Sequence, residues 1–311
     1  MRFGVQLPQY GRFAGPDALL QMAHAAEALG WDSVWTSDHI VIPRPHTDRF
    51  TATFYDLIAT LAFVAAQTSR IRLGTSVLLL PYRHPVTLAK QVATLDALSK
   101  GRTIIGVAPG WMEKEFEILG VPYRGRGKLH DETLRAMIKI WTSEDTSFAG
   151  EYYRFPAFEF GPRPVQKPYP PIWIGGNDRR ALRRTIELGT GWHPITSLRI
   201  GLTLEQLTER IRELRQIAEA HGRDVREITL SLRAPLAFEE DAGRLSEYLT
   251  FIGDPGEITR RLDRCAALGI TEVLFDTFYS IPDKMETGTI DDFIRTMERF
   301  AREVRPKLAG A

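Results

Sequence analysis

The sequence of 311 residues contains a single cysteine, Cys265, and almost no net charge. One cysteine cannot form an intrachain disulfide, and it fits a reducing compartment. A formal charge of +1 gives no general attraction to nucleic acid or to a membrane surface. The longest apolar stretch, residues 57–66, is half a membrane span, and the first residues are too polar for a signal peptide. We therefore expect a soluble cytoplasmic protein without nucleic-acid or membrane partners.

The signatures of several catalytic classes are also missing. The seven histidines are scattered without His-x-His or His-x-x-x-His spacing, so no metal site is predicted. There is no Gly-x-Ser-x-Gly elbow, no Walker loop and no cysteine nucleophile at the end of a predicted strand. These absences disfavour serine and cysteine hydrolases and P-loop nucleotide enzymes.

The most regular pattern lies between residues 70 and 110. An apolar run over 71–80, an amphipathic segment over 85–98 and a second apolar run over 101–110 predict one βαβ unit. Pro85 suits the first turn of the helix, where its missing N–H would have no partner anyway. Both strands end in residues that bend the backbone, and parallel αβ proteins carry their chemistry at such strand ends.

The same alternation extends along the chain. Further strands are predicted at residues 2–7, 31–35, 172–175, 191–193, 227–232 and 272–275, and further helices at 16–29, 53–68, 111–119, 128–141, 178–188, 203–221, 255–268 and 290–304. Residues 146–171 have no helical period and are expected to form a hairpin or loop excursion, and 239–253 an insertion. Eight strand–helix alternations predict one α/β domain over 1–311, a (β/α)8 TIM barrel with its site at the C-terminal mouth.

Two strand ends carry candidate functional residues. Asp38 and His39 follow the strand at 31–35 and could exchange protons near neutral pH, although a capping Asp and a hydrogen-bonded surface His are equally open. Gly175-Gly176-Asn177 precedes arginines at positions 179, 180, 183 and 184. Glycine N–H groups at a helix start can approach an anion, which would offset cations that oppose the helix dipole. A solvated basic face is the alternative.

Three segments resemble the luciferase-like monooxygenase superfamily, and within it the branch that uses the deazaflavin coenzyme F420. They are Gly-Thr-Ser-Val-Leu at 74–78, Pro-Val-Thr-Leu-Ala-Lys-Gln at 85–91 and Gly-Arg-Thr-Ile-Ile-Gly-Val-Ala-Pro-Gly-Trp at 101–111. The resemblance covers nearly the whole chain and implies the same barrel fold. It also implies a non-prolyl cis peptide at Ser76–Val77, whose bulge supports the flavin ring from behind.

The resemblance further implies roles for the strand ends. Asp38 would contact the cofactor, His39 would lie over the reactive face of the ring as an acid or charge stabiliser, and the glycine stretch would hold the phosphate. The cofactor-binding residues expected on this basis are Asp38, Ser76, Val77, Pro109, Gly110, Gly175, Gly176, Asn177, Arg179 and Arg180.

Trp111 departs from the pattern of the family. Its sugar-phosphate dehydrogenases carry a catalytic glutamate at the matching position, so glucose 6-phosphate chemistry is not expected here. We predict instead that Trp111, with Trp192 and His193, lines an apolar substrate pocket. Glu113 and Glu115 are expected to form a solvated helix start that the helix dipole favours.

The expected function is hydride transfer between F420 and a small apolar or cyclic organic substrate. An FMN-dependent monooxygenase using reduced flavin and oxygen is the first alternative, because FMN and F420 share the ring outline and the ribityl phosphate. A cofactor-binding protein without turnover and a phosphate-binding barrel isomerase are further alternatives. A homodimer is compatible with each of these functions.

Overall fold

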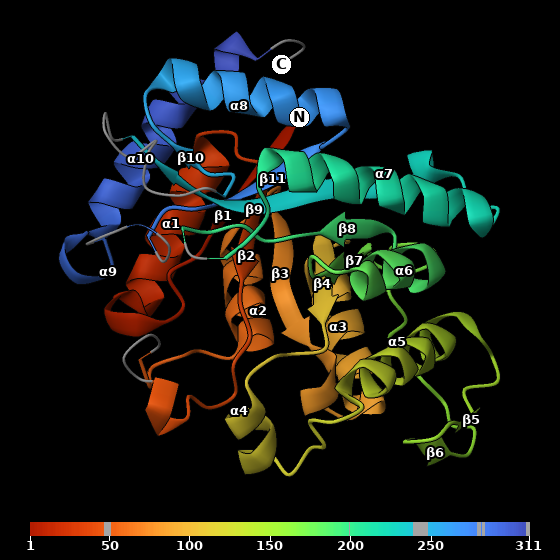
Figure 1. Ribbon diagram of the computed structural model, residues 1–311. Coiled ribbons are helices and arrows are strands. Elements are labelled where there is room, and N and C mark those ends of the chain that lie inside the picture. The colour runs from red at the N-terminus through yellow and green to blue at the C-terminus, as the bar shows by residue number, and fades with distance from the viewer. Residues whose placement is uncertain (47–50, 199, 239–247, 279–280, 282–283, 309–311) are drawn as a thin grey trace.

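The computed structural model describes residues 1–46, 51–198, 200–238, 248–278, 281 and 284–308. Within this part of the chain, eight parallel strands close into a barrel (Figure 1). In spatial order they are β1 (Arg2–Gln6), β2 (Ser33–Thr36), β3 (Arg72–Leu79), β4 (Thr103–Ala108), β7 (Ile172–Gly175), β8 (Gly191–His193), β9 (Thr229–Ala237) and β11 (Glu272–Asp276). Pairing of β8 with β9 and of β11 with β1 closes the ring. The predicted TIM barrel is confirmed.

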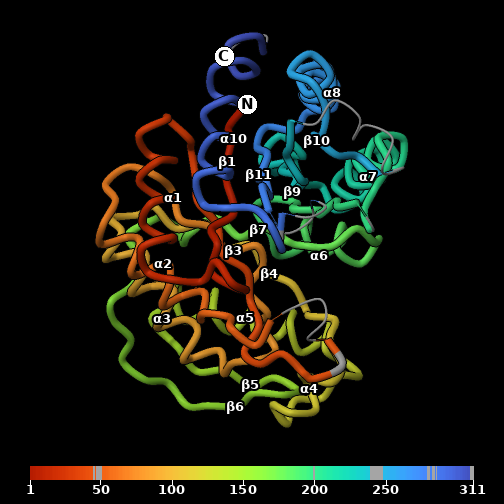
Figure 2. The backbone as a smooth tube through the Cα atoms, turned by 90° about the vertical axis from the view of Figure 1, so that its left-hand side faces the viewer, coloured from red at the N-terminus to blue at the C-terminus, as the bar shows by residue number. Residues whose placement is uncertain are grey.

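Helices surround the barrel on its outside (Figures 1 and 2). The long ones are α1 (Pro16–Ala28), α2 (Leu57–Gln67), α3 (Pro85–Leu98), α5 (Arg126–Thr142), α6 (Arg179–Leu188), α7 (Leu204–Ala220), α8 (Pro255–Leu268) and α10 (Ile290–Glu303). Two are short, α4 (Glu113–Ile118) and α9 (Lys284–Thr287), and a 3-10 turn, η3 (Leu80–Tyr82), follows β3. No helix among the described residues has the length and apolar character needed to cross a membrane.

Some boundaries differ from those predicted. The helix expected from residue 53 begins at Leu57, because the Asp56 side chain caps it by accepting a hydrogen bond from the Ala59 N–H. The strand expected to end at residue 232 runs on to Ala237. The excursion over 146–171 contains an antiparallel hairpin, as expected, formed by β5 (Phe148–Ala149) and β6 (Arg154–Phe155).

The expected insertion after β9 is described in part. Residues 239–247 lie outside the described residues. The remainder includes β10 (Phe251–Ile252), which pairs in parallel with the end of β9. This pairing continues the sheet beyond the barrel at that edge.

Two tryptophans fill the inside of the barrel. The rings of Trp35 in β2 and Trp173 in β7 lie with their centroids 5.2 Å apart, and Ile104 and Leu274 complete this buried cluster. Gly74 on the neighbouring strand makes room for Trp35, because a Cβ there would lie 2.2 Å from a ring carbon. The indole therefore takes the space that a side chain on β3 would fill.

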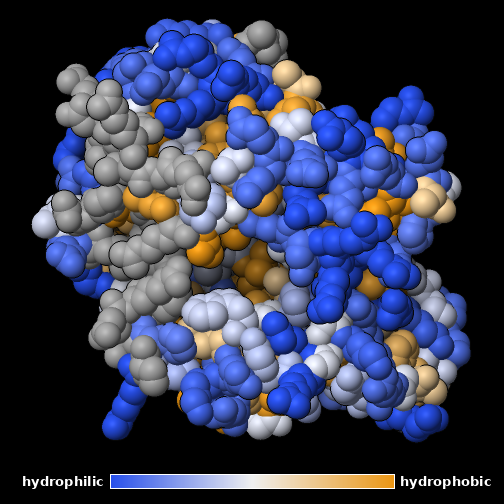
Figure 3. Space-filling model, in the orientation of Figure 1, coloured by the Kyte–Doolittle hydropathy of each residue, from blue (hydrophilic) through white to orange (hydrophobic). Residues whose placement is uncertain are grey.

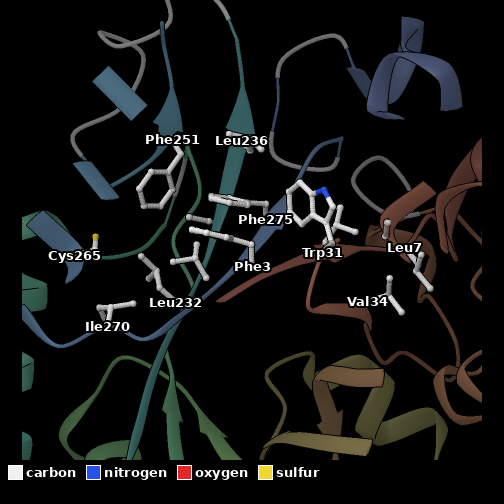
Figure 4. Packing of buried hydrophobic residues seen from close by; sticks show 14 of the residues in the cluster. Phe3, Leu7, Trp31, Val34, Leu232, Leu236, Phe251, Cys265, Ile270 and Phe275 are labelled. Atoms are coloured by element: carbon white, nitrogen blue, oxygen red, sulfur yellow. The ribbon is translucent and has the colours of Figure 1, made fainter. Parts of the chain in front are cut away.

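Outward-facing side chains pack the barrel against its helices. Phe3 of β1 stacks on Phe275 with ring centroids 5.9 Å apart, and it meets Phe300 of α10 edge-on at 4.9 Å. Figure 4 shows Phe3, Phe275 and Trp31 close together in this cluster. Cys265 of α8 belongs to the same cluster, and burial raises the pKa of its thiol to about 12.

Substitution of Gly74 by alanine tests the fit of Trp35 in the barrel. The added methyl group would overlap the indole, which is confined by its neighbours, so we expect a loss of about 1–3 kcal/mol in the free energy of unfolding. Denaturant unfolding followed by circular dichroism measures this loss.

Gly15→Ala is the matched control, because a Cβ at Gly15 meets nothing within 4 Å. Gly15 is the N-cap of α1, where alanine is less favoured than glycine, so we expect a loss of less than about 1 kcal/mol in the free energy of unfolding. Equal stability of the Gly74→Ala protein and the wild type would contradict the packing described for Trp35.

Candidate active site

The end of β3 shapes the mouth of the barrel. The register between β3 and β4 shifts after Thr75, the Ser76–Val77 peptide is cis, and Val77 is partly exposed between the buried Ser76 and Leu78. The cis peptide implied by the family resemblance is thus confirmed. Figure 3 shows the molecule hollowed near the centre of one face, with apolar residues inside the hollow, in the region that β3 and β4 occupy in Figure 1.

His39 lies just beyond the end of β2 and is held by a carboxylate. Its Nδ1 is 2.6 Å from Oε2 of Glu115, and the two side chains are 8% and 0% exposed. The imidazole meets the ring of Phe54 edge-on at 5.2 Å and that of Trp111 edge-on at 6.4 Å. The candidate proton donor or acceptor therefore has a fixed orientation among aromatic rings.

Glu115 is the centre of a buried hydrogen-bond cluster. Its Oε1 accepts from the backbone N–H groups of Ile40 at 2.7 Å and Val41 at 3.2 Å, and its Oε2 also accepts from the Tyr82 hydroxyl at 3.0 Å. Burial and the charge of Glu115 raise the pKa of Tyr82, so the phenol keeps its proton and acts as a donor. The expectation that Glu115 is a solvated residue is wrong, because α4 turns this side chain inward.

A signal for this burial is present in the sequence. Met112, Glu115, Phe116 and Leu119 follow the i, i+3, i+4, i+7 spacing of one helix face, and three of these four are apolar. A carboxylate on an apolar face must find partners inside the protein. Glu113, the neighbouring glutamate on α4, is exposed as expected.

Asp38 links the ends of β2 and β3. Its carboxylate forms two hydrogen bonds with the Arg83 guanidinium, at 2.6 and 3.0 Å, and accepts from the Leu79 N–H at 2.9 Å. Burial raises the pKa of the Asp38 carboxyl, and the guanidinium opposes that rise. Both carboxylate oxygens are thus engaged within the protein. The sequence reasoning overlooked Arg83, which is 45 residues away along the chain.

His193 belongs to a second buried chain of hydrogen bonds. The Ser231 hydroxyl donates to the Trp192 carbonyl and so accepts from His193 Nδ1 at 2.7 Å, while Nε2 accepts from the Ser76 hydroxyl at 2.9 Å. Burial and the nearby Arg233 charge lower the pKa of His193 to about 3. This imidazole is neutral at physiological pH and holds Ser76 in place.

Arg233, also overlooked in the sequence, lies beneath the bulge of β3. Its guanidinium donates to the Ser76 carbonyl at 2.7 Å and to the Ser37 hydroxyl at 3.1 Å, and it pairs with Asp276 at 3.0 Å. Both members of the ion pair are buried. The mouth of the barrel therefore rests on a polar layer that includes Asp276.

Three of the four arginines that follow the glycine stretch after β7 pair with carboxylates. Arg179 pairs with Glu213 at 3.1 Å, and the two later arginines also have carboxylate partners, Glu187 for position 183 and Asp131 for position 184. Arg180 is exposed and has no ion-pair partner among the described residues.

Two side chains of the same stretch serve the protein itself. The Asn177 amide bonds both backbone groups of Ile195, with Nδ2 donating to the carbonyl at 3.0 Å and Oδ1 accepting from the N–H at 3.3 Å. Asp178 caps α6 by accepting from the Ala181 N–H at 2.8 Å. An anion at this loop would therefore share the helix start with a carboxylate.

The predicted substrate-pocket residues fall in different places. Trp111 is 47% exposed at the mouth, and the ring of His46 meets it edge-on at 5.6 Å. His193 points into the barrel, where it stacks on Trp35. Trp192 was expected beside it and is instead fully buried in the outer cluster, with its Nε1 donating to the Gly176 carbonyl at 2.9 Å. Adjacent residues of a strand face opposite sides, so both could not line the mouth.

The mouth fits a flat cofactor that carries a phosphate. Gly110, which follows Pro109 after β4, and Gly176 have φ angles of 83° and 122°, and a Cβ on either would lie 3.0 Å from a neighbouring side chain. On Gly175 a Cβ would lie 3.1 Å from Cγ1 of Val77. Glycine backbone thus lies at the end of β7 and just after β4, and at Gly175 it is next to the partly exposed Val77. In the described part of the chain, no cluster of three or more His, Cys, Asp or Glu could hold a metal ion.

Comparisons with known proteins agree with this geometry. Residues 1–253 match the sequence model of a family described as luciferase-like monooxygenase. An uncharacterized protein of Mycobacterium tuberculosis is 31% identical over 318 residues, which cover 98% of this chain and 99% of that one. An F420-dependent glucose-6-phosphate dehydrogenase of Kineococcus radiotolerans is 32% identical over 240 residues, 76% of this chain and 68% of that protein.

A solved structure, that of a monooxygenase from Streptomyces bottropensis, is similar in fold with a TM-score of 0.80 and 23% identity, and the match covers 98% of this chain and 99% of that one. The barrel, the bulge of β3 at its mouth and a family match over most of the sequence lead to one conclusion: this chain belongs to the luciferase-like monooxygenase family.

Proposed function

We propose that this protein is an F420-dependent oxidoreductase, which transfers a hydride between the deazaflavin and a small apolar or cyclic organic substrate. The observation that carries the proposal is His39, fixed by Glu115 at the barrel mouth. The 32% identity to a protein named as an F420-dependent dehydrogenase supports the choice of cofactor. When bound, the deazaflavin would supply the redox chemistry, and the protein would supply orientation and a proton partner.

His39 is suited to the proton side of the reaction. Hydride removal from an alcohol carbon also releases the hydroxyl proton, and hydride delivery to a carbonyl needs one. Because Glu115 occupies Nδ1 of His39, this exchange would pass through Nε2. Trp111 lies edge-on to the imidazole and would form an apolar wall for the substrate.

The remaining residues would hold the cofactor. The partly exposed Val77 would support the ring, and Ser76 is fixed behind it by His193 and Arg233. The backbone at Gly110, Gly175 and Gly176 would allow close approach of the ring and phosphate. Asp38 would act indirectly, by fixing the end of β3 through Leu79 and Arg83.

An FMN-dependent monooxygenase is the second candidate. The description of the family and the monooxygenase from S. bottropensis with the same fold favour it. The glycines, Val77 and Arg180 would serve FMN as well, since both cofactors have the same ring outline and ribityl phosphate. A binding protein without turnover is less favoured, because it would have no use for the buried His39–Glu115 pair.

The choice between the two cofactors can be measured by titration. We expect F420 to bind at least tenfold more tightly than FMN, a difference of about 1.4 kcal/mol. Quenching of intrinsic tryptophan fluorescence reports the binding of each, since Trp111 lies at the mouth. An FMN affinity equal to or above that of F420 would move the protein to the monooxygenase branch.

Substitution of His39 by alanine tests its role in proton transfer. We expect turnover with F420 and a competent substrate to fall by about 10²–10³, with little change in cofactor affinity. His24→Ala is the control, because this histidine lies on α1 and bonds the Gln67 carbonyl. Full turnover in the His39→Ala protein would exclude His39 as the proton partner.

Arg180→Ala tests the phosphate site. We expect a loss of about 1–3 kcal/mol in F420 binding, as for a charge-assisted hydrogen bond, and a smaller loss at high salt. Arg183 lies on the same helix, but its charge is paired with Glu187, so the Arg183→Ala protein should bind F420 as the wild type does.

Gly176→Val should abolish the binding of F420. If the Gly176→Val protein is folded and binds F420 normally, the phosphate lies elsewhere.

A further inference from the structure

The carboxylate of Glu115 is more tightly held than a structural carboxylate at a helix start needs to be. It is fully buried and accepts hydrogen bonds from four donors, which belong to two segments of the chain, residues 39–41 and Tyr82. The backbone N–H groups of Ile40 and Val41 fix Oε1, and the Tyr82 hydroxyl and the His39 imidazole share Oε2. The carboxylate therefore cannot rotate away from His39 without breaking several of these bonds.

We propose that Glu115 is the positioning residue of His39: it holds the imidazole in the Nδ1–H form and provides the counter-charge when the imidazole is protonated. An ionised carboxylate only accepts hydrogen bonds, so Nδ1 must carry a hydrogen. In the neutral ring the lone pair is then on Nε2, the nitrogen that would exchange a proton with the substrate. In the charged ring, the anion 2.6 Å away stabilises the imidazolium.

The other ionisable groups that the structure describes around His39 do not replace this anion. Asp38, next in sequence, is directed to the Arg83 guanidinium at 2.6 Å, and Asp56 binds the same guanidinium at 3.0 Å. Tyr82 on η3 is neutral and donates to the same carboxylate. The ring of His46 meets Trp111, which also contacts His39 edge-on. Among the described residues, Glu115 is the carboxylate in direct contact with the imidazole.

The role of Glu115 in turnover rests on the proposed function, whereas its effect on the His39 imidazole does not. Its first test therefore uses the protein without cofactor. Long-range ¹H–¹⁵N spectra of the seven histidines, with His39→Gln for assignment, report the tautomer and the titration midpoint of each ring. We expect neutral His39 to be the Nδ1–H tautomer in the wild type. An Nε2–H tautomer would overturn the proposal, and this measurement needs no change at Glu115.

Glu115→Gln keeps the size of the side chain and removes its charge. We expect the titration midpoint of His39 to fall by about one pH unit or more, a tenfold or greater loss in proton affinity. Glu115→Asp keeps the charge, so the His39 midpoint in this variant should lie close to that of the wild type. Glu113→Gln, at an exposed position on the same helix, should leave it unchanged. The same midpoint in the wild-type and Glu115→Gln proteins would overturn the proposal.

A second measurement separates this inference from the proposed function. With F420 and a competent substrate, the pH limb of kcat in Glu115→Gln should shift in the same direction as the His39 midpoint, with little change in KM. A pH limb that stays in place while the NMR midpoint moves would overturn the role of Glu115 in turnover. Absence of F420 turnover in the wild type would overturn the proposed function and leave the NMR result as the test of the His39–Glu115 pair.

Discussion

A carboxylate removed from water must be surrounded by donors, and in this protein that requirement organises the mouth of the barrel. Glu115 meets it with donors from the loop after β2, which includes His39, and from η3. Loss of any one of these donors would leave the others to compensate a buried charge. The position of His39 therefore follows from the hydrogen bonds that the buried Glu115 of α4 needs.

Two more buried ion pairs extend the same principle around the mouth. Asp38 and Arg83 connect the ends of β2 and β3, and Arg233 and Asp276 connect β9 and β11 beneath the bulge. Each pair joins segments that are far apart in sequence, and each also bonds a backbone group of β3, at Leu79 or Ser76. The strand that would support the cofactor ring is thus fixed by charged groups that are largely shielded from solvent.

The sequence was sufficient for the barrel and for the segments that form its mouth, because both depend on local patterns. Apolar periods identified the strands, and glycine and proline marked their ends. The charged partners could not be found in this way, since nothing local connects Asp38 with Arg83. Arg233 fell outside a strand that was predicted to end at residue 232 and that continues for five more residues. Trp192 was placed at the mouth although it neighbours the inward-facing His193, an error that strict alternation would have prevented.

The buried thiol of Cys265 has a practical consequence. With its pKa raised to about 12, almost none of it is the thiolate that alkylating and oxidising reagents attack at neutral pH. In its folded state the chain behaves toward such reagents as though it had no cysteine at all. A single cysteine introduced on the surface could therefore carry a fluorophore or spin label selectively, without prior removal of the native residue.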